Sequence, residues 1–142
     1  EVYTRPVFNS AARAFIFIKV DRSIKNDNEN INTQARNLFK NGWSLMVYPQ
    51  GTRAQKENFL PFKSGAFHIA LENNVPILPV VIAGTGDIWP KGSKFMKSGK
   101  AIINTLDPID ITKYTKDTID ELVFETQEKM AKVYKELTDS IK

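Results

Sequence analysis

Cysteine is absent from this sequence of 142 residues, and histidine occurs only once, at His68. Without cysteine the chain forms no disulfide, carries no thiol nucleophile and offers no thiolate ligand to a metal. A zinc site needs three or four nitrogen, sulfur or oxygen ligands, so a single histidine argues against zinc, and we expect no bound metal. Candidate functional residues must therefore be sought among other residue types.

Long apolar stretches are also scarce. The longest one near the start covers residues 14–18, between Arg13 and Lys19, whereas a membrane-spanning helix needs ~20 apolar residues. Neither sign of charge dominates, because 20 Lys and Arg against 16 Asp and Glu leave a net charge of +4. This mild excess suits an anionic partner such as phosphate, nucleic acid or an acidic membrane surface. Length and composition indicate one globular domain over residues 1–142.

Apolar runs predict four strands, because β-branched and aromatic residues suit a buried sheet. The expected strands cover residues 14–20, 43–48, 75–83 and 101–106. The third run contains Pro76 and Pro79, and proline has no N–H to donate to a ladder. This strand should therefore begin late or lie at an edge of the sheet.

Helical periodicity predicts three helices. They are expected from Asn32 or Thr33 to Lys40, over residues 64–73, and along an apolar stripe from Ile119 to Ile141. Thr118 and Glu121 have the spacing of a capping box at the start of the last helix. Strands that alternate with helices predict an α/β fold, with a mixed or mostly parallel sheet covered by helices.

The sequence Y-P-Q-G-T-R at residues 48–53, called here the glycine turn, ends the second expected strand. Glycine lets the backbone approach a ligand closely, and backbone N–H groups in such a turn can hold an anion. The guanidinium of Arg53 matches the geometry of phosphate oxygens, and Lys63 precedes a helix N-terminus, which attracts anions. Arg22 follows the first strand. These residues predict an anion site, and the alternative is a set of exposed turns with solvated side chains.

Four segments in this order resemble conserved blocks of the glycerophospholipid acyltransferases, the family that includes the 1-acyl-sn-glycerol-3-phosphate (lysophosphatidic acid) acyltransferases. F-I-K-V-D-R at residues 17–22 resembles the second block, and the glycine turn resembles the third, usually F-P-E-G-T-R. L-P-F-K-S-G-A at residues 60–66 is similar to the segment that follows, and V-P-I-L-P-V at residues 75–80 to the fourth block. The resemblance covers residues 14–110.

This resemblance implies an enzyme of phospholipid biosynthesis that moves a fatty acyl group from acyl carrier protein or acyl-CoA to the free hydroxyl of a lysophospholipid such as lysophosphatidic acid. It implies a phosphate site formed by Arg22, Gln50, Gly51, Thr52, Arg53 and Lys63. It also implies an acyl pocket that includes Pro76 and Ile77. The thioester donor is a substrate, so no bound cofactor is expected. The expected partners are these lipids, acyl carrier protein and the cytoplasmic face of a membrane.

The sequence departs from the family in two ways. The first block, H-x-x-x-x-D, supplies the histidine that removes a proton from the attacking hydroxyl, and it does not occur here. His68 has Asn73 at the matching spacing, and Glu72 is its neighbour on a helix face, so a structural histidine is the expected role and a catalytic His68 is the alternative. Gln50 stands where the family has glutamate.

These departures leave two hypotheses. The first is an acyltransferase truncated at its N-terminus, with no catalytic residue in these 142 residues and no activity on its own. The second is a degenerate relative that binds phospholipid without catalysing transfer.

A lysine-rich segment at residues 90–100 contains no acidic residue and includes Phe95 and Met96. Its lysines are Lys91, Lys94, Lys97 and Lys100. This composition predicts a loop that docks on anionic lipid or on an acidic carrier protein, and a solvated loop is the alternative. Nucleic acid is not expected as a partner, because the aromatic residues are not interleaved with basic ones in a sheet pattern.

Overall fold

The computed structural model describes residues 28–53 and 59–141. Its contacts divide the chain into two compact units, Glu1–Leu45 and Met46–Lys142. The strand expected at residues 14–20 and the candidate site residue Arg22 lie outside the described residues. The single domain expected over residues 1–142 stays a prediction.

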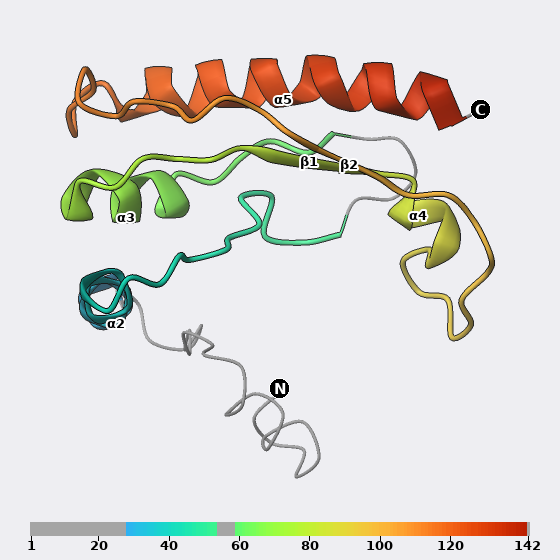
Figure 1. The fold of residues 1–142 in the computed structure, drawn as a ribbon, viewed down its shortest axis with the longest axis horizontal. Helices are drawn as coiled ribbons and strands as arrows, with labels where there is room; N and C mark the ends of the chain where they lie inside the picture. Colours follow the sequence, from blue (N-terminus) through green and yellow to red (C-terminus); the bar gives the residue numbers. More distant parts are fainter. Residues whose placement is uncertain (1–27, 54–58, 142) are drawn as a thin grey trace, which may run out of the picture. The chain divides into compact units, whose positions relative to one another are not determined.

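In the first unit, the chain forms helix α2, Asn28–Lys40 (Figure 1). The helix begins earlier than the sequence predicted, because its first turn is supported by polar contacts that apolar periodicity does not reveal. The hydroxyl of Thr33 donates to the carbonyl oxygen of Glu29 at 2.9 Å, and an acidic residue in the first turn suits the positive end of the helix dipole. The end at Lys40 is confirmed, and Gly42 follows it at a φ of 76°.

The strand expected at residues 43–48 is not formed. Four of its large apolar side chains are exposed: Trp43, Met46, Val47 and Tyr48. An apolar composition favours burial, but a strand also needs a neighbouring backbone to receive its hydrogen bonds. In the described part of the chain, the ladder and the isolated bridge are formed by later segments. The prediction of a strand here was therefore wrong.

The second unit contains two paired strands, β1 (Val80–Ala83) and β2 (Ile102–Thr105). They run antiparallel, with Val80 opposite Thr105. Residues on β1 alternate between partly buried and buried, as expected for a strand with one face against the core. Both strands lie within runs that the sequence predicted.

Proline sets the start of β1. An isolated bridge between Ile77 and Ile109 continues the pairing beyond the strand, and Leu106 donates its N–H to the carbonyl oxygen of Pro79 at 3.0 Å. Pro79 accepts this bond but has no N–H to return. The late start that the prolines predicted is confirmed.

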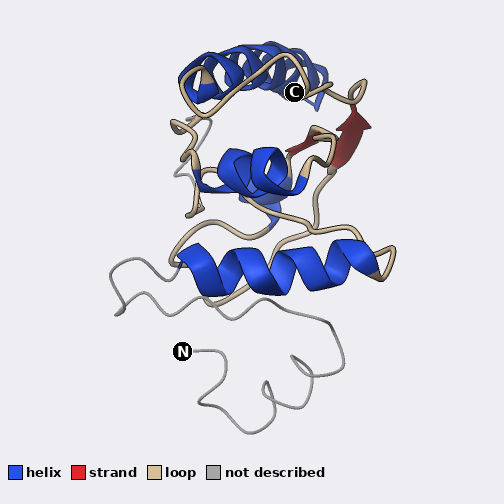
Figure 2. Ribbon diagram, turned by 90° about the vertical axis from the view of Figure 1, so that its left-hand side faces the viewer, coloured by secondary structure: helices blue, strands red, loops and turns tan. Residues whose placement is uncertain are grey.

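Helices α3 (Gly65–Asn73) and α5 (Ile119–Ile141) confirm the other two predicted helices. Figures 1 and 2 show α5 running along one side of the strand pair, which it contacts through β1, and α5 also contacts α3. The core cluster consists of Phe67, Ile109, Ile111, Ile119 and Leu122. Leu122 is fully buried, and its burial stabilises the fold by roughly 1.5–3 kcal/mol.

The capping box expected at the start of α5 is wrong in its side-chain part. The hydroxyl of Thr118 accepts a hydrogen bond from the N–H of Thr115 at 2.9 Å. A turn ending at Thr118 places this hydroxyl against Thr115, because Thr118 also donates its own N–H to the Thr115 carbonyl at 3.3 Å. The carbonyl oxygen of Thr118 receives the N–H groups of Glu121 and Leu122, so the helix does begin where the sequence predicted.

A short helix, α4 (Thr85–Ile88), links β1 to the lysine-rich segment. Gly84 precedes it at a φ of 84°, and a Cβ added to Gly84 would collide with the carbonyl oxygen of Lys100. Glycine at this position therefore lets the end of β1 approach the last residue of the lysine-rich segment closely. Within the described residues, none of these helices has the length and apolarity needed to span a membrane.

Candidate anion-binding site

The glycine turn has a closed geometry. The N–H of Gly51 donates to the carbonyl oxygen of Tyr48 at 3.0 Å, and Gly51 has a φ of +68°. This left-handed conformation costs other residue types about 1–2 kcal/mol, so glycine is the residue that the turn requires. Thr52 and Arg53 follow directly and are exposed.

A second segment, which carries Lys63, lies beside this turn. Lys63 donates its backbone N–H to the carbonyl oxygen of Pro49 at 2.9 Å, and Gln50 donates its side-chain amide to the carbonyl oxygen of Leu60 at 3.3 Å. A Cβ added to Gly51 would lie 3.3 Å from both Cε and Nζ of Lys63. The missing side chain of Gly51 therefore leaves room for the lysine ammonium to lie over the turn.

The same contact explains a structural use of Gln50. A glutamine amide donates hydrogen bonds, whereas the glutamate usual at this position in the family only accepts them when ionised. The bond to Leu60 is therefore one that the glutamine supports and an ionised glutamate does not. Gln50 thus joins the glycine turn to the Lys63 segment through an uncharged hydrogen bond.

Helix α5 contacts the residue that precedes Lys63. The side-chain oxygen of Gln127 accepts a hydrogen bond from the N–H of Phe62 at 2.7 Å, across 65 residues of sequence. The ring of Phe62 also stacks at 5.4 Å from the ring of Phe59 and 6.4 Å from the ring of Phe67. Gln127 was not predicted as a site residue. No local sequence signal marked it, because its contact with Phe62 follows from tertiary packing.

Two residues that follow α4, Trp89 and Lys91, contact side chains of the glycine turn. The guanidinium carbon of Arg53 lies 5.3 Å from the centre of the Trp89 ring, a distance typical of a cation–π contact. The ammonium of Lys91 lies 3.4 Å from the hydroxyl of Thr52. Trp89 was missed, because a tryptophan 36 residues from its arginine leaves no local pattern in the sequence.

Three cationic side chains thus surround one turn: Arg53, Lys63 and Lys91. None of them forms an ion pair with a carboxylate among residues 28–53 and 59–141. All three are exposed. Positive charges that have no carboxylate partner among the described residues, gathered at a glycine turn, attract an anion such as a phosphate group.

The structure places the expected acyl-pocket residues elsewhere. Ile77 packs against the core cluster and pairs with Ile109, while Pro76 is exposed at the end of α3. Their role in an acyl pocket stays a prediction.

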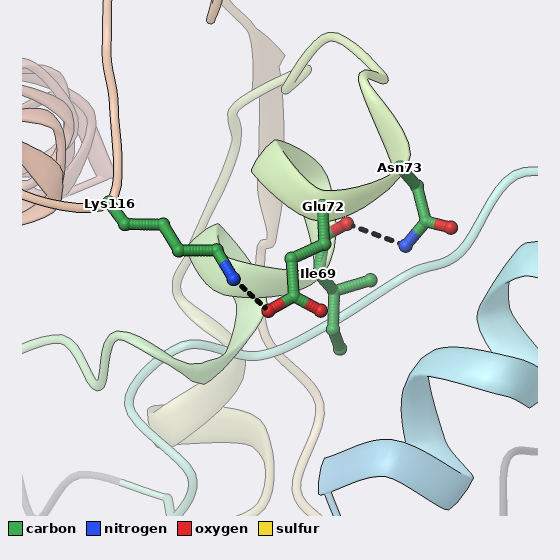
Figure 3. A network of polar contacts seen from close by, with 4 residues as sticks. All are labelled: Ile69, Glu72, Asn73 and Lys116. Carbon is green, nitrogen blue, oxygen red and sulfur yellow. Dashed lines mark hydrogen bonds and ion pairs between the residues drawn. The ribbon is translucent and has the colours of Figure 1, made fainter.

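His68 lies on α3, and Figure 3 shows how its expected partners are engaged. The carboxylate of Glu72 pairs with the ammonium of Lys116 at 3.2 Å, so the suggested pairing of Glu72 with His68 is wrong. The side-chain amide of Asn73 donates to the carbonyl oxygen of Ile69 at 2.8 Å. Lys116 lies on the loop before α5 and competes for the carboxylate with a full positive charge. Neither neighbour supplies the aspartate that a catalytic histidine needs.

Over the described ranges, no group of three or more His, Asp and Glu side chains is placed to hold a metal ion. The turn instead presents ammonium and guanidinium groups, which bind anions directly.

Relatives of this chain are known from bacteria and eukaryotes. The 1-acyl-sn-glycerol-3-phosphate acyltransferase of Haemophilus influenzae is 36% identical over 125 residues, which cover 87% of this chain and 51% of the relative. The enzyme of the same name from Saccharomyces cerevisiae is 36% identical over 122 residues, which cover 83% of this chain and 40% of the relative. The chain thus spans about half the length of the curated relatives it matches.

A solved structure has a similar fold. The crystal structure of the 1-acyl-sn-glycerophosphate (LPA) acyltransferase PlsC from Thermotoga maritima superposes with a TM-score of 0.80 and 28% sequence identity. The match covers 96% of this chain and 53% of that chain. It confirms the acyltransferase fold, of sheet and covering helices, that the sequence predicted.

The family assignment follows from a match that includes the glycine turn. Residues 1–83, more than half of the chain, match the family described as Acyltransferase. This range contains all four segments that resemble the conserved blocks, together with Gly51, Arg53 and Lys63 of the structural site. The chain therefore belongs to the Acyltransferase family.

Proposed function

We propose that this chain carries the acceptor-phosphate site of an enzyme that transfers a fatty acyl group to a lysophospholipid such as lysophosphatidic acid. One observation carries the proposal: the Lys63 ammonium lies over Gly51, Lys91 contacts the adjacent Thr52, and Arg53 extends from the same turn to Trp89. The names of the relatives support the choice of acceptor, since several are 1-acyl-sn-glycerol-3-phosphate acyltransferases. The reaction belongs to phospholipid biosynthesis.

In this reaction the free hydroxyl of the acceptor attacks the carbonyl carbon of an acyl thioester. A C–O ester bond forms, the C–S bond breaks, and the thiol of acyl-CoA or acyl carrier protein leaves. Arg53 offers the acceptor phosphate a planar pair of donors, and Lys63 adds a mobile ammonium. These contacts hold the acceptor in place, and the turn itself does no chemistry on the reacting bond.

The proton on the attacking hydroxyl must pass to a general base. The sequence contains no H-x-x-x-x-D block, and Glu72 beside His68 is paired with Lys116. We therefore expect the base outside these 142 residues and no transfer by the chain alone. Since the acceptor is a lipid, we also propose that the protein works at the cytoplasmic face of a membrane.

The test is transfer to lysophosphatidic acid by the full-length gene product, with acyl-CoA and acyl carrier protein thioesters supplied in turn. Arg53→Ala should lower kcat/KM for the acceptor about 10–150-fold, because a hydrogen bond to a charged group contributes about 1.5–3 kcal/mol. Arg36→Ala, which removes an exposed arginine of α2, is the matched control and should leave the rate unchanged. Equal rates for both variants would remove Arg53 from the site.

A second candidate function is phospholipid binding without catalysis, which the Gln50 substitution favours. Glutamine has lost the charge that the family's glutamate carries, and it is used here to hold the backbone at Leu60. If the full-length protein binds lysophosphatidic acid but transfers no acyl group from either donor, this second function is the correct one. Transfer at any rate that Arg53→Ala reduces would exclude it.

A further inference from the structure

The lysine-rich segment presents an apolar tip surrounded by positive charge. Phe95 is 80% exposed and Met96 is 71% exposed, although large apolar side chains are usually buried. Lys94 and Lys97 flank this pair, and Lys91 and Lys100 lie farther out along the chain. No acidic residue interrupts residues 90–100, so the charge of the segment is not neutralised locally.

Hydrogen bonds hold this tip in one conformation. Trp89 donates its indole N–H to the carbonyl oxygen of Ser93 at 3.0 Å. The hydroxyl of Ser93 donates to the carbonyl oxygen of Phe95 at 2.7 Å and accepts the N–H of Phe95 at 3.2 Å. Phe95 is therefore exposed within a hydrogen-bonded turn. A rigid apolar tip loses little entropy when it inserts into a partner.

The base of the segment is also fixed. Lys97 donates its N–H to the carbonyl oxygen of Ile88 at 2.8 Å, and a Cβ added to Gly99 would lie 2.8 Å from the Ile88 side chain. The close approach of Gly84 to the backbone of Lys100 closes the loop. Figure 1 shows the segment projecting beyond α4, on the side away from α5.

The segment is joined to the anion site at its beginning. Trp89 lies against the guanidinium of Arg53, and Lys91 reaches the hydroxyl of Thr52. A surface that captures the tip therefore also brings the glycine turn close to that surface. Trp89 and Lys91 each make this connection by direct contact of their side chains.

We propose that residues 90–100 form a docking loop for an anionic lipid bilayer, with Phe95 and Met96 inserted among the headgroups and the lysines paired with lipid phosphates. Lysines near an anionic membrane gain electrostatic attraction, and interfacial segments bury aromatic and apolar side chains at the same depth. Nucleic acid would use the lysines but has no apolar layer for Met96. The combination of charge and an apolar tip therefore favours lipid.

The proposal rests on the proposed function in one respect, because it treats the bilayer as the source of the phospholipid acceptor. Its experiment needs no acyl transfer. The purified 142-residue chain is sedimented with vesicles of phosphatidylglycerol and phosphatidylcholine, and with vesicles of phosphatidylcholine alone. Binding should be strong for the anionic vesicles and should decrease as salt screens the lysines.

Two pairs of variants locate the contact. The triple substitution Lys94→Gln, Lys97→Gln, Lys100→Gln should weaken vesicle binding about tenfold or more. The same change at Lys129, Lys132 and Lys135, which are exposed on α5, is the charge-matched control. Phe95→Ser should also weaken binding, whereas Phe124→Ser, at a 63% exposed position of α5, should not. All four variants change exposed residues, and unfolding curves confirm that each is folded.

Equal binding by all variants, or no binding to anionic vesicles, would overturn the proposal. An effect of the lysines without an effect of Phe95, together with similar affinity for double-stranded DNA, would also overturn it in favour of a general polyanion site. Transfer assays of the full-length protein in detergent micelles separate this result from the catalytic question. Transfer in micelles with no vesicle binding rejects the docking loop alone, and vesicle binding with no transfer rejects the proposed reaction alone.

Discussion

Gly51 is the residue on which the anion site depends for its shape. Alanine at this position must adopt a φ of +68° and place its Cβ 3.3 Å from the Lys63 side chain. Gly51→Ala should therefore lower the free energy of unfolding by about 1–2 kcal/mol, measured by urea denaturation. Gly65→Ala is the matched control, because no atom lies within 4 Å of the added Cβ, and its stability should stay equal or rise. Equal effects would show that the turn tolerates a side chain.

Asp110 links stability to pH. The N–H of Thr112 donates to its carboxylate at 2.9 Å, and the backbone bond, the Thr112 side chain and nearby Lys113 together hold the pKa of Asp110 below its ordinary value. A carboxylate with a lowered pKa in the folded state stabilises the fold above its unfolded pKa, and this contribution is lost as the pH falls through the folded pKa.

Asp110→Asn keeps an acceptor for Thr112 but removes the charge. We expect this variant to be less stable than the wild type at pH 7 and the difference to shrink as the pH decreases below about 4. Urea denaturation at several pH values measures both quantities. A difference that is independent of pH would contradict the assignment of the effect to ionised Asp110.

At the residue scale, the sequence was informative where chemistry is local. Gly51 and Arg53 were predicted as site residues because they occur within one short motif, and Lys63 because it precedes a helix; the structure places the Lys63 side chain against Gly51. Trp89 and Gln127 were missed, since their contacts join distant parts of the chain. Such contacts follow from tertiary packing, which a single sequence does not encode in any local pattern.

At the scale of elements, α5 both builds the core and supports the anion site. Gln127→Leu leaves the partly buried N–H of Phe62 without its partner. A fully buried group left unsatisfied costs about 1–3 kcal/mol, which is an upper bound for this position. Because Lys63 follows Phe62 directly, we expect the full-length protein to show a raised KM for the acceptor with a smaller change in kcat.

The conservative variant Gln127→Glu keeps the acceptor oxygen and should restore most of the acceptor affinity. Glu128→Ala changes the adjacent exposed residue of α5 and is the control for a general effect on the helix. A KM that is unchanged in Gln127→Leu would show that the Lys63 segment needs no support from α5.

The elements themselves were predicted where periodicity or proline decides the outcome. The apolar stripe of α5 predicted a helix from Ile119 to Ile141, as found, and Pro79 correctly delayed the start of β1. The start of α2 was missed because polar side-chain bonds, such as Thr33 to Glu29, extend the helix. Residues 43–48 were misassigned because their composition carries no information about a pairing partner.

At the scale of the whole molecule, the proposed acyl transfer requires a general base for the attacking hydroxyl. His68 is the only histidine of the 142 residues, and its neighbour Glu72 is held by Lys116. If His68 took the proton, its removal would cost roughly 10²–10⁴-fold in rate. We expect His68→Ala to leave kcat/KM of the full-length protein unchanged, because the proposed function does not use His68 as its base.

His68 is half-buried on α3, so a loss of activity in His68→Ala has to be separated from a loss of folding. His68→Gln keeps a polar side chain of similar size, and it removes the imidazole that a base would need. Full activity of both variants, together with no transfer by the 142-residue chain alone, would place the proton acceptor outside this chain. A large loss in both variants, with unfolding curves like that of the wild type, would make His68 the base and contradict the proposed location of the base outside these 142 residues.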